Sequence, residues 1–312
     1  MNLYILRFRM KLFVTKILLF TIILVVLFFM ALYISSCYVS KRDFSNGNTE
    51  SNTLVIGENQ TFDFVILGIS HGRVMSRDLN HDKVEIICSK RFLNLAQGRG
   101  QCGFSEQEYY LKYFYRKGNS TNTLVYFITP PMFFNSNLAN NSFTFVDEPF
   151  KFDFLWNYMF FESEEKPNRI LEYTRSKFKD SWIQLRPLNS TENLNVLDSV
   201  DSLKIANGLK SAYPMGLDSL RFQKSIKTLE ETISMAKQHG TETVFVIAPS
   251  LINVWPGQSE VEDFLEKMSH TYGTQFYNFS DAIQDPHLFY DHHHLNSRGV
   301  EIFAKDYLCG IL

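Results

Sequence analysis

The chain has 312 residues, which is enough for one large domain or two small ones once a targeting segment is set aside. Its 31 basic and 33 acidic residues give a net charge of -2, which excludes the strongly positive field typical of proteins that bind nucleic acid. Aromatic residues make up 15% of the chain, so we expect exposed aromatic surface as well as an aromatic core.

The N-terminal part of the chain predicts a membrane anchor followed by a linker. Residues 1–16 carry basic side chains and no acidic one, and the uncharged run Ile17–Ile34 is long enough to cross most or all of a hydrocarbon core of about 30 Å. Basic residues before the span favour a cytoplasmic N-terminus and a domain on the outer side of a bacterial membrane. The run ends in Ile-Ser-Ser-Cys37, which also resembles a lipobox, so residues 1–36 are either an uncleaved anchor or a lipoprotein signal. Residues 37–61 are mostly polar and predict a linker.

The expected domain, residues 62–312, opens on a strand that ends near a serine. Phe64–Leu67 form an apolar run typical of a buried strand, and Gly68-Ile69-Ser70 follows directly. Ligands of open α/β sheets bind beyond the carboxyl ends of the strands, so Ser70 is a candidate nucleophile; the alternative is that it only caps the next helix. Gly68–Gly72 also fits the Gly-x-Ser-x-Gly elbow of α/β-hydrolases. Too little chain precedes this strand for that architecture.

Strands and helices alternate up to residue 135 and again after residue 215. The expected helices are 73–80, 106–116, 219–239 and 261–272, and the expected strands are 84–88, 124–128, 243–249 and 276–279. This alternation predicts a parallel sheet with helices on both faces, a three-layer α/β/α sandwich. Residues 136–215 are crowded with aromatic side chains and fit no such pattern. We expect an insertion over the carboxyl edge of the sheet, with most of its aromatics forming a subsidiary core rather than a carbohydrate platform.

A glycine-rich turn, Gln97–Gln101, offers two further candidates. Glycine permits a positive φ and lets a backbone N–H approach a ligand closely, which makes Gly98 and Gly100 candidate ligand-binding residues. A plain turn between a strand and a helix explains the same residues equally well.

Near the C-terminus, residues 289–299 contain a candidate base and a candidate acid. A serine hydroxyl becomes a strong nucleophile only when a base removes its proton, and the base needs a third group to fix its tautomer. His294 and Asp291, three positions apart, can supply both roles from one loop. A polar surface loop without any such task is the alternative.

Neither the histidines nor the cysteines predict a metal centre, and we expect no cofactor. His292, His293 and His294 are consecutive, but consecutive residues of a loop point in different directions, so only one of them need face the site. The chain has no Cys-x-x-Cys pair, and Cys88 and Cys102 are expected either to form a disulfide or to remain buried free thiols.

Two motifs together resemble those of a known family. Gly-Ile-Ser70 near the start of residues 61–312, with Asp-x-x-His-Leu-Asn-x-x-Gly at 291–299, resembles the SGNH (GDSL-type) hydrolase superfamily. More narrowly, it is similar to the membrane-anchored branch that includes the teichoic acid D-alanine transfer protein and the alginate O-acetylation proteins. The resemblance implies a flavodoxin-like sheet and a catalytic set of Ser70, His294 and Asp291.

The resemblance also implies an oxyanion hole. Its donors would be the N–H groups of Ser70 and of either Gly98 or Gly100. The chain departs from the family at Thr129-Pro-Pro, where a Gly-x-Asn block normally supplies a third donor. Asn135 or Asn137 would have to substitute for it.

Together these expectations give a function. We expect a membrane-tethered serine esterase or O-acyltransferase that acts, outside the cytoplasm, on ester groups of cell-envelope glycan or polysaccharide. A membrane-bound acyltransferase is a candidate partner, and nucleic acid is not. The alternative, of a different class, is a non-catalytic glycan-binding or scaffold protein of the envelope on the same fold.

Overall fold

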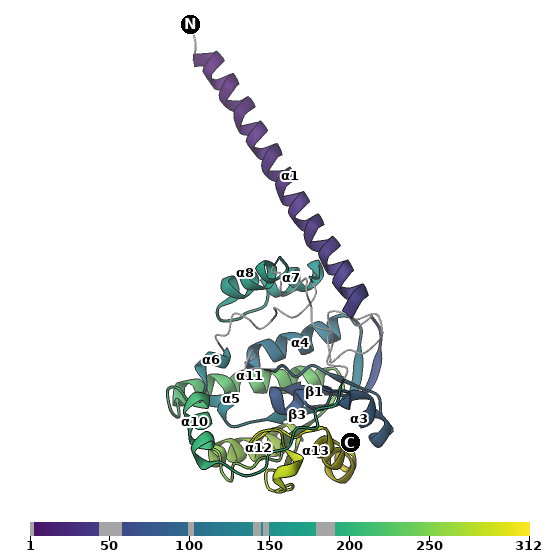
Figure 1. Cartoon of the computed structure of the whole chain (residues 1–312). Coiled ribbons are helices and arrows are strands. Elements are labelled where there is room, and N and C mark those ends of the chain that lie inside the picture. The colour runs from purple at the N-terminus through teal and green to yellow at the C-terminus, as the bar shows by residue number, and fades with distance from the viewer. Residues whose placement is uncertain (1–2, 44–57, 99–102, 140–144, 146–149, 179–190) are drawn as a thin grey trace.

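The computed structural model describes residues 3–43, 58–98, 103–139, 145, 150–178 and 191–312, and Figure 1 shows their arrangement. A long helix, α1, projects from a domain in which helices enclose a sheet. The strands are β1 (Thr61–Gly68), β2 (Phe92–Asn94), β3 (Ser120–Ile128), β4 (Glu242–Ile247) and β5 (Gln275–Asn278).

All neighbouring strands are parallel, in the order β2-β1-β3-β4-β5. The chain therefore runs outward in opposite directions from the β1–β3 pair. In this flavodoxin-like order the crevice at the carboxyl ends of that pair is the usual place for a ligand. The serine that follows β1 lies at this position.

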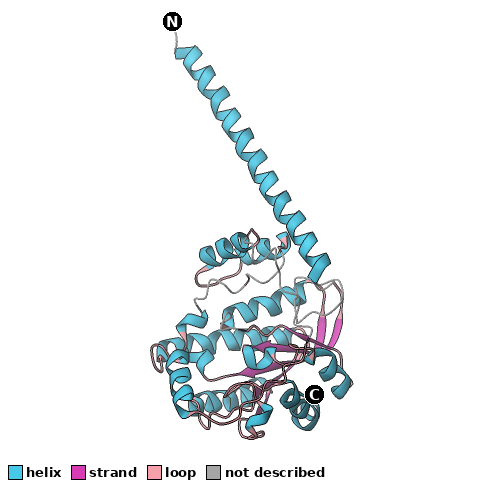
Figure 2. Cartoon of the chain, viewed as in Figure 1, coloured by secondary structure: helices cyan, strands magenta, loops and turns pink. Residues whose placement is uncertain are grey.

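Helices cover both faces of the sheet (Figure 2). Successive residues of β1 enter different cores, because side chains of a strand alternate between its faces: Val65 and Leu67 pack with one set of helices, and Phe64 and Ile66 with the other. The first set is α4 (Phe104–Arg116), α11 (Ser219–Gln238) and α12 (Gln258–Tyr272), and the second is α3 (Asn80–Cys88) and α13 (Ser297–Phe303). The predicted three-layer α/β/α sandwich is confirmed.

Shorter elements complete the description. These are α2 (Ser70–Arg73), α5 (Pro131–Phe134), α6 (Ser136–Ala139), α7 (Phe152–Met159), α8 (Lys166–Ser176), α10 (Ser202–Ala212) and short C-terminal turns at Pro286–Leu288, Ala304–Leu308 and Cys309–Ile311.

Helix α1 (Leu3–Asp43) contains a stretch, Met10–Cys37, that is long and apolar enough to span a membrane. Its apolar side chains are almost all exposed from Met10 to Leu27. A helix in the core of a soluble domain would have such apolar side chains buried, so their exposure agrees with the predicted anchor.

The strand predicted at 84–88 is wrong, because these residues form the second half of α3. In a helix Val84, Ile87 and Cys88 fall on one face, and they pack in the core, whereas Ile86 is exposed. A run of five mostly apolar residues fits both patterns, so periodicity alone could not decide between them. The predicted helix at 73–80 is also displaced, since α2 occupies Ser70–Arg73 and turns follow it.

The last described part of the insertion contacts the loop at residues 291–296, where Asn195 and Asp201 bond to Asn296 and His292. Its first part forms the predicted subsidiary aromatic core elsewhere in the domain. Helices α7 and α8 lie outside α4, toward the side from which α1 projects (Figure 1). The ring of Tyr109 on α4 contacts Phe154, Tyr158 and Phe161, all of them buried. Trp182, another aromatic residue of the insertion, lies outside the described residues.

The one disulfide among the described residues joins Cys88 to Cys309. The expected pairing of Cys88 with Cys102 is therefore wrong, and so is the expectation that Cys88 stays a free thiol; Cys102 itself lies outside the described residues. The bond ties the end of α3 to the C-terminal turn, two segments that are 221 residues apart in sequence. Cys37 is a free and exposed thiol.

Candidate active site

The structure brings Ser70, His294 and Asp291 together in one chain of hydrogen bonds. The Nε2 atom of His294 lies 2.6 Å from the Ser70 Oγ, and its Nδ1 atom lies 2.8 Å from the Asp291 Oδ2. An ionised carboxylate only accepts hydrogen bonds, so Nδ1 carries the hydrogen and Nε2 accepts from the serine hydroxyl. This is the tautomer that a general base for Ser70 requires.

The loop that carries the acid and the base is held by its own short-range contacts. Asp291 Oδ1 accepts the backbone N–H groups of His293 and His294, and the N–H of Tyr290 donates to the carbonyl of His294. One carboxylate thus closes the turn and orients the imidazole. Burial acts to raise the pKa of Asp291, but the hydrogen bond from His294, the electrostatic attraction of the neighbouring imidazoles and the backbone N–H of His293 outweigh it and lower that pKa.

The last residues of the motif fix this loop to the rest of the domain. The Asn296 side chain caps α13 by accepting the N–H of Gly299, and it donates to the carbonyls of His287 and Asn195. A Cβ on Gly299 would lie 2.2 Å from the carbonyl oxygen of Leu288. Only glycine therefore allows the helix to start this close to the preceding turn.

The candidate nucleophile is positioned by the end of β1. Gly68 has a φ of +134°, and a Cβ there would lie 2.6 Å from the carbonyl oxygen of Phe127, so glycine is required where the chain turns out of the sheet. The buried side chain of Asn94 on β2 donates to the carbonyl of Gly72, which holds the turn of α2 that follows Ser70.

Two backbone N–H groups near the end of β1 have no acceptor among the described residues. They belong to Ser70 and to the buried Gly98. The Gln97 N–H donates to the carbonyl of Gly68, which holds the Gly98 turn next to the end of β1. A buried N–H without an acceptor is rare in proteins and is what an oxyanion hole presents before substrate binds. Gly100 lies outside the described residues.

The suggested third donors are occupied elsewhere. The Asn135 side chain donates to the carbonyl of Ala212 and accepts the N–H of Asn137, whose own side chain is exposed. Thr129, the residue after β3, forms a hydrogen bond between its Oγ1 and the Nδ1 of His71 at 3.0 Å.

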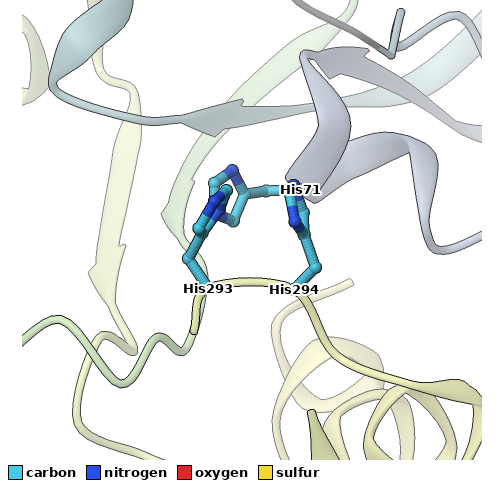
Figure 3. Close-up of side chains that lie close together, drawn as sticks. All are labelled: His71, His293 and His294. Atoms are coloured by element: carbon cyan, nitrogen blue, oxygen red, sulfur yellow. The ribbon is translucent and has the colours of Figure 1, made fainter. Parts of the chain in front are cut away.

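Two histidines that sequence reasoning left aside pack against His294. Figure 3 shows His71, from α2, reaching toward His293, with the ring of His294 beside them. His71 Nε2 lies 3.3 Å from His293 Nδ1, and the rings of His293 and His294 are 3.9 Å apart. Burial lowers the pKa of His293 to about 4 and holds that of His71 well below its usual range, so both rings are neutral near pH 7. His292 points away and accepts the N–H of Asp201.

These three rings are also the candidate metal ligands. One nitrogen from each of His71, His293 and His294 lies within 4.8 Å of the others. Both nitrogens of His294 already bond to Ser70 and Asp291, so a metal held by all three would have to displace one of those bonds. The hydrogen-bonded chain from Thr129 through His71 to His293 accounts for the cluster without an ion.

Comparison with known proteins gives distant likenesses to solved structures. No protein-family model matches the chain, and no curated protein matches it. A crystal structure from Bacteroides fragilis, provisionally described as an acylhydrolase, is 10% identical with a TM-score of 0.39, and the match covers 88% of this chain and 97% of that one. A likeness this distant has no bearing on activity.

A polar cavity of about 500 Å³ is lined by Tyr290, the residue before Asp291, but not by Ser70, Asp291 or His294 themselves. The ring of Tyr290, which lines it, stacks parallel to that of His294 with the centroids 5.3 Å apart. Most of the other lining residues are polar or charged: Arg77, Asp78, Thr191, Glu192, Asn193 and Asn195. A volume of this size suits a small polar ligand or one sugar unit of a larger one.

Several of these neighbours carry no signal in the local sequence. Trp255, which follows β4, packs edge-on against His71 and His293, and nothing in the residues around it links it to the other two. His71 lies at the start of α2, as its place beside Ser70 predicts, but its side chain is buried. The contact of Trp255 with these rings is found only when the strand ends are placed side by side.

Proposed function

We propose that this protein is a membrane-tethered serine esterase or O-acyltransferase that acts on acyl esters of cell-envelope glycan. The observation that supports the proposal is the single chain of hydrogen bonds from Ser70 through His294 to Asp291, with two N–H groups near its serine end that have no acceptor among the described residues. One loop supplies the base and the acid, and the nucleophile comes from a segment 224 residues from His294, in the hydrogen-bonded order that acyl transfer needs.

The reaction would proceed in two steps. The Ser70 Oγ attacks the ester carbonyl carbon while its proton passes to Nε2 of His294, and the N–H groups of Ser70 and Gly98 stabilise the oxyanion. The ester C–O bond then breaks and the leaving alcohol takes the proton from Nε2. In the second step water or a sugar hydroxyl gives a proton to Nε2 and attacks the acyl-serine, which releases an acid or a new ester and restores Ser70.

The location and the substrate class are supported by separate features. Helix α1 is apolar enough to cross a bilayer, and the Cys88–Cys309 disulfide is of a kind that persists outside the reducing cytoplasm. The polar cavity beside Tyr290 favours a hydrophilic substrate such as a glycan over a long acyl chain.

Covalent labelling by a fluorophosphonate probe tests the proposal, because such probes react with serines activated by a base. Full-length wild type should be labelled, and Ser70→Ala and His294→Ala should not. His287→Ala is a matched control, since His287 also pairs with an aspartate but is exposed and remote from the serine. It should be labelled like wild type.

Thermal unfolding of each variant shows whether it is folded. His294→Ala should unfold at nearly the wild-type temperature, because a catalytic imidazole contributes little to stability. A folded wild-type protein that takes no label would contradict the proposal and favour a non-catalytic glycan-binding role on the same fold. Labelling that survives in Ser70→Ala would show that another serine reacts.

A further inference from the structure

Helix α7 presents an apolar face that the domain leaves uncovered. Phe152, Trp156, Met159 and Phe160 are 55%, 49%, 48% and 73% exposed, and their spacing places them on one side of the helix. The opposite side is buried against α4 through Phe154 and its neighbours. Single exposed apolar residues are ordinary, but four of them on two turns of one helix form a patch of the kind that marks an interaction surface.

This face lies directly beside the helix that can cross the membrane. The ring of Phe29 on α1 packs against that of Phe152 at 5.8 Å, and Ser36 Oγ donates to the carbonyl of Phe150 at 2.6 Å. Leu32 is buried at the same junction, and Phe28 contacts Phe178, which follows α8. Figure 1 shows α7 and α8 on the side of the domain from which α1 projects.

The contact fixes the depth of α7 along the span. The continuous apolar run of α1 ends at Ile34, before Ser35 and Ser36, and Phe29 lies five residues earlier, which is about 8 Å at 1.5 Å per residue. Phe152, packed on Phe29, is therefore level with the last part of the apolar run. Amphipathic helices that bind membranes bury their apolar faces about 5–10 Å into the boundary between headgroups and acyl chains, so this depth suits such a helix.

We propose that the exposed face of α7 is embedded in the interfacial layer of the same bilayer that α1 spans. The occupant of this face is lipid, because α1 would place lipid beside it and because tryptophan and other aromatic side chains favour the membrane interface. The domain would then lie against the membrane in one orientation rather than move freely on a tether. The proposal depends on α1 as a span and not on any role of Ser70.

Quenching by brominated lipids tests this on the full-length protein in nanodiscs that each hold one copy. The fluorescence of Trp156 is obtained as the difference between wild type and Trp156→Phe, a substitution that keeps the face aromatic. In discs whose lipids are brominated in the upper part of the acyl chain, this component should lose most of its intensity relative to discs of the same lipids without bromine. Soluble iodide should scarcely affect it.

A matched control places a tryptophan on an exposed apolar position away from α1. Leu203 on α10 is 70% exposed, and Figure 1 shows α10 on the other side of the domain. Leu203→Trp in the Trp156→Phe background should add fluorescence that iodide quenches and brominated lipid does not. If the Trp156 component is quenched by iodide instead, the face is in water and the proposal is wrong. If neither quencher reaches it, protein covers the face, which contradicts the proposal as well.

Discussion

Replacing Asp291 by asparagine tests the hydrogen-bonded chain without changing its shape. In the native loop Oδ1 accepts two backbone N–H groups, and Oδ2 accepts the Nδ1 hydrogen of His294. An amide has one oxygen and one NH₂ group, so the asparagine side chain can satisfy only one of these two sets. Keeping the turn preserves two hydrogen bonds rather than one, so the amide should turn its NH₂ group toward His294.

The NH₂ group would then donate to Nδ1 and move the imidazole hydrogen to Nε2. In that tautomer His294 cannot accept the Ser70 proton. A general base contributes about 10²–10⁴ in rate, so labelling by a fluorophosphonate should slow by about that factor, or about 3–5 kcal/mol at 1.36 kcal/mol per decade.

The assay is the pseudo-first-order rate constant of labelling, measured at one probe concentration for wild type, Asp291→Asn and Asp285→Asn. Asp285 is the matched control, since it pairs with His287 at 2.9 Å and caps a helical turn, but on the surface. It should label at the wild-type rate. If Asp291→Asn is folded and reacts as fast as wild type, the carboxylate does not orient the base and the reasoning fails.

Three further predictions concern stability in the folded domain. Burial lowers the pKa of His293 from 6.5 to about 4, so in this pH range the unfolded chain binds a proton that the folded chain does not. The free energy of unfolding should therefore fall by up to about 3 kcal/mol between pH 6.5 and 4. Urea titrations should show a smaller fall with pH for His293→Gln than for wild type. Arg169 and Glu106 form a fully buried ion pair, so Arg169→Met should cost about 3–5 kcal/mol in urea denaturation, and adding Glu106→Gln should recover most of it. Reducing the Cys88–Cys309 disulfide releases a loop of more than 200 residues and should lower the free energy of unfolding by up to about 5 kcal/mol, seen as a lower melting temperature.

The meeting of Ser70, Asp291 and His294 could be predicted because local patterns determine it. An apolar run that ends at a glycine locates a strand end, and parallel strands bring their carboxyl ends to one edge. The three-residue spacing of Asp291 and His294 lets one carboxylate close the turn and bond the ring. Each of these is a short-range rule, and the fold then brings the two segments together.

The predictions that proved wrong concern features that depend on contacts between distant segments. Residues 84–88 fit both a strand and a helix, and only packing against α13 and the C-terminal turns selects the helix. The disulfide partner of Cys88 is 221 residues away, at a position no local pattern marks. In the same way, Trp255 becomes a neighbour of the site only through the order of the strands.

Thr129, which follows β3, bears on how such a site would work. Its hydroxyl bonds to His71, and the Asn135 side chain bonds to Ala212, so the oxyanion donors that we propose among the described residues are the N–H groups of Ser70 and Gly98. One oxyanion donor is worth about 10²–10³ in rate, so a site with two should be correspondingly slower on an unactivated ester than a site with three. A domain held against the membrane can offset slow chemistry, because fixing its orientation raises the effective concentration of an ester presented at that surface. The membrane contact of α7 and the proposed donors at Ser70 and Gly98 would then belong to one arrangement, in which positioning adds to what the donors contribute.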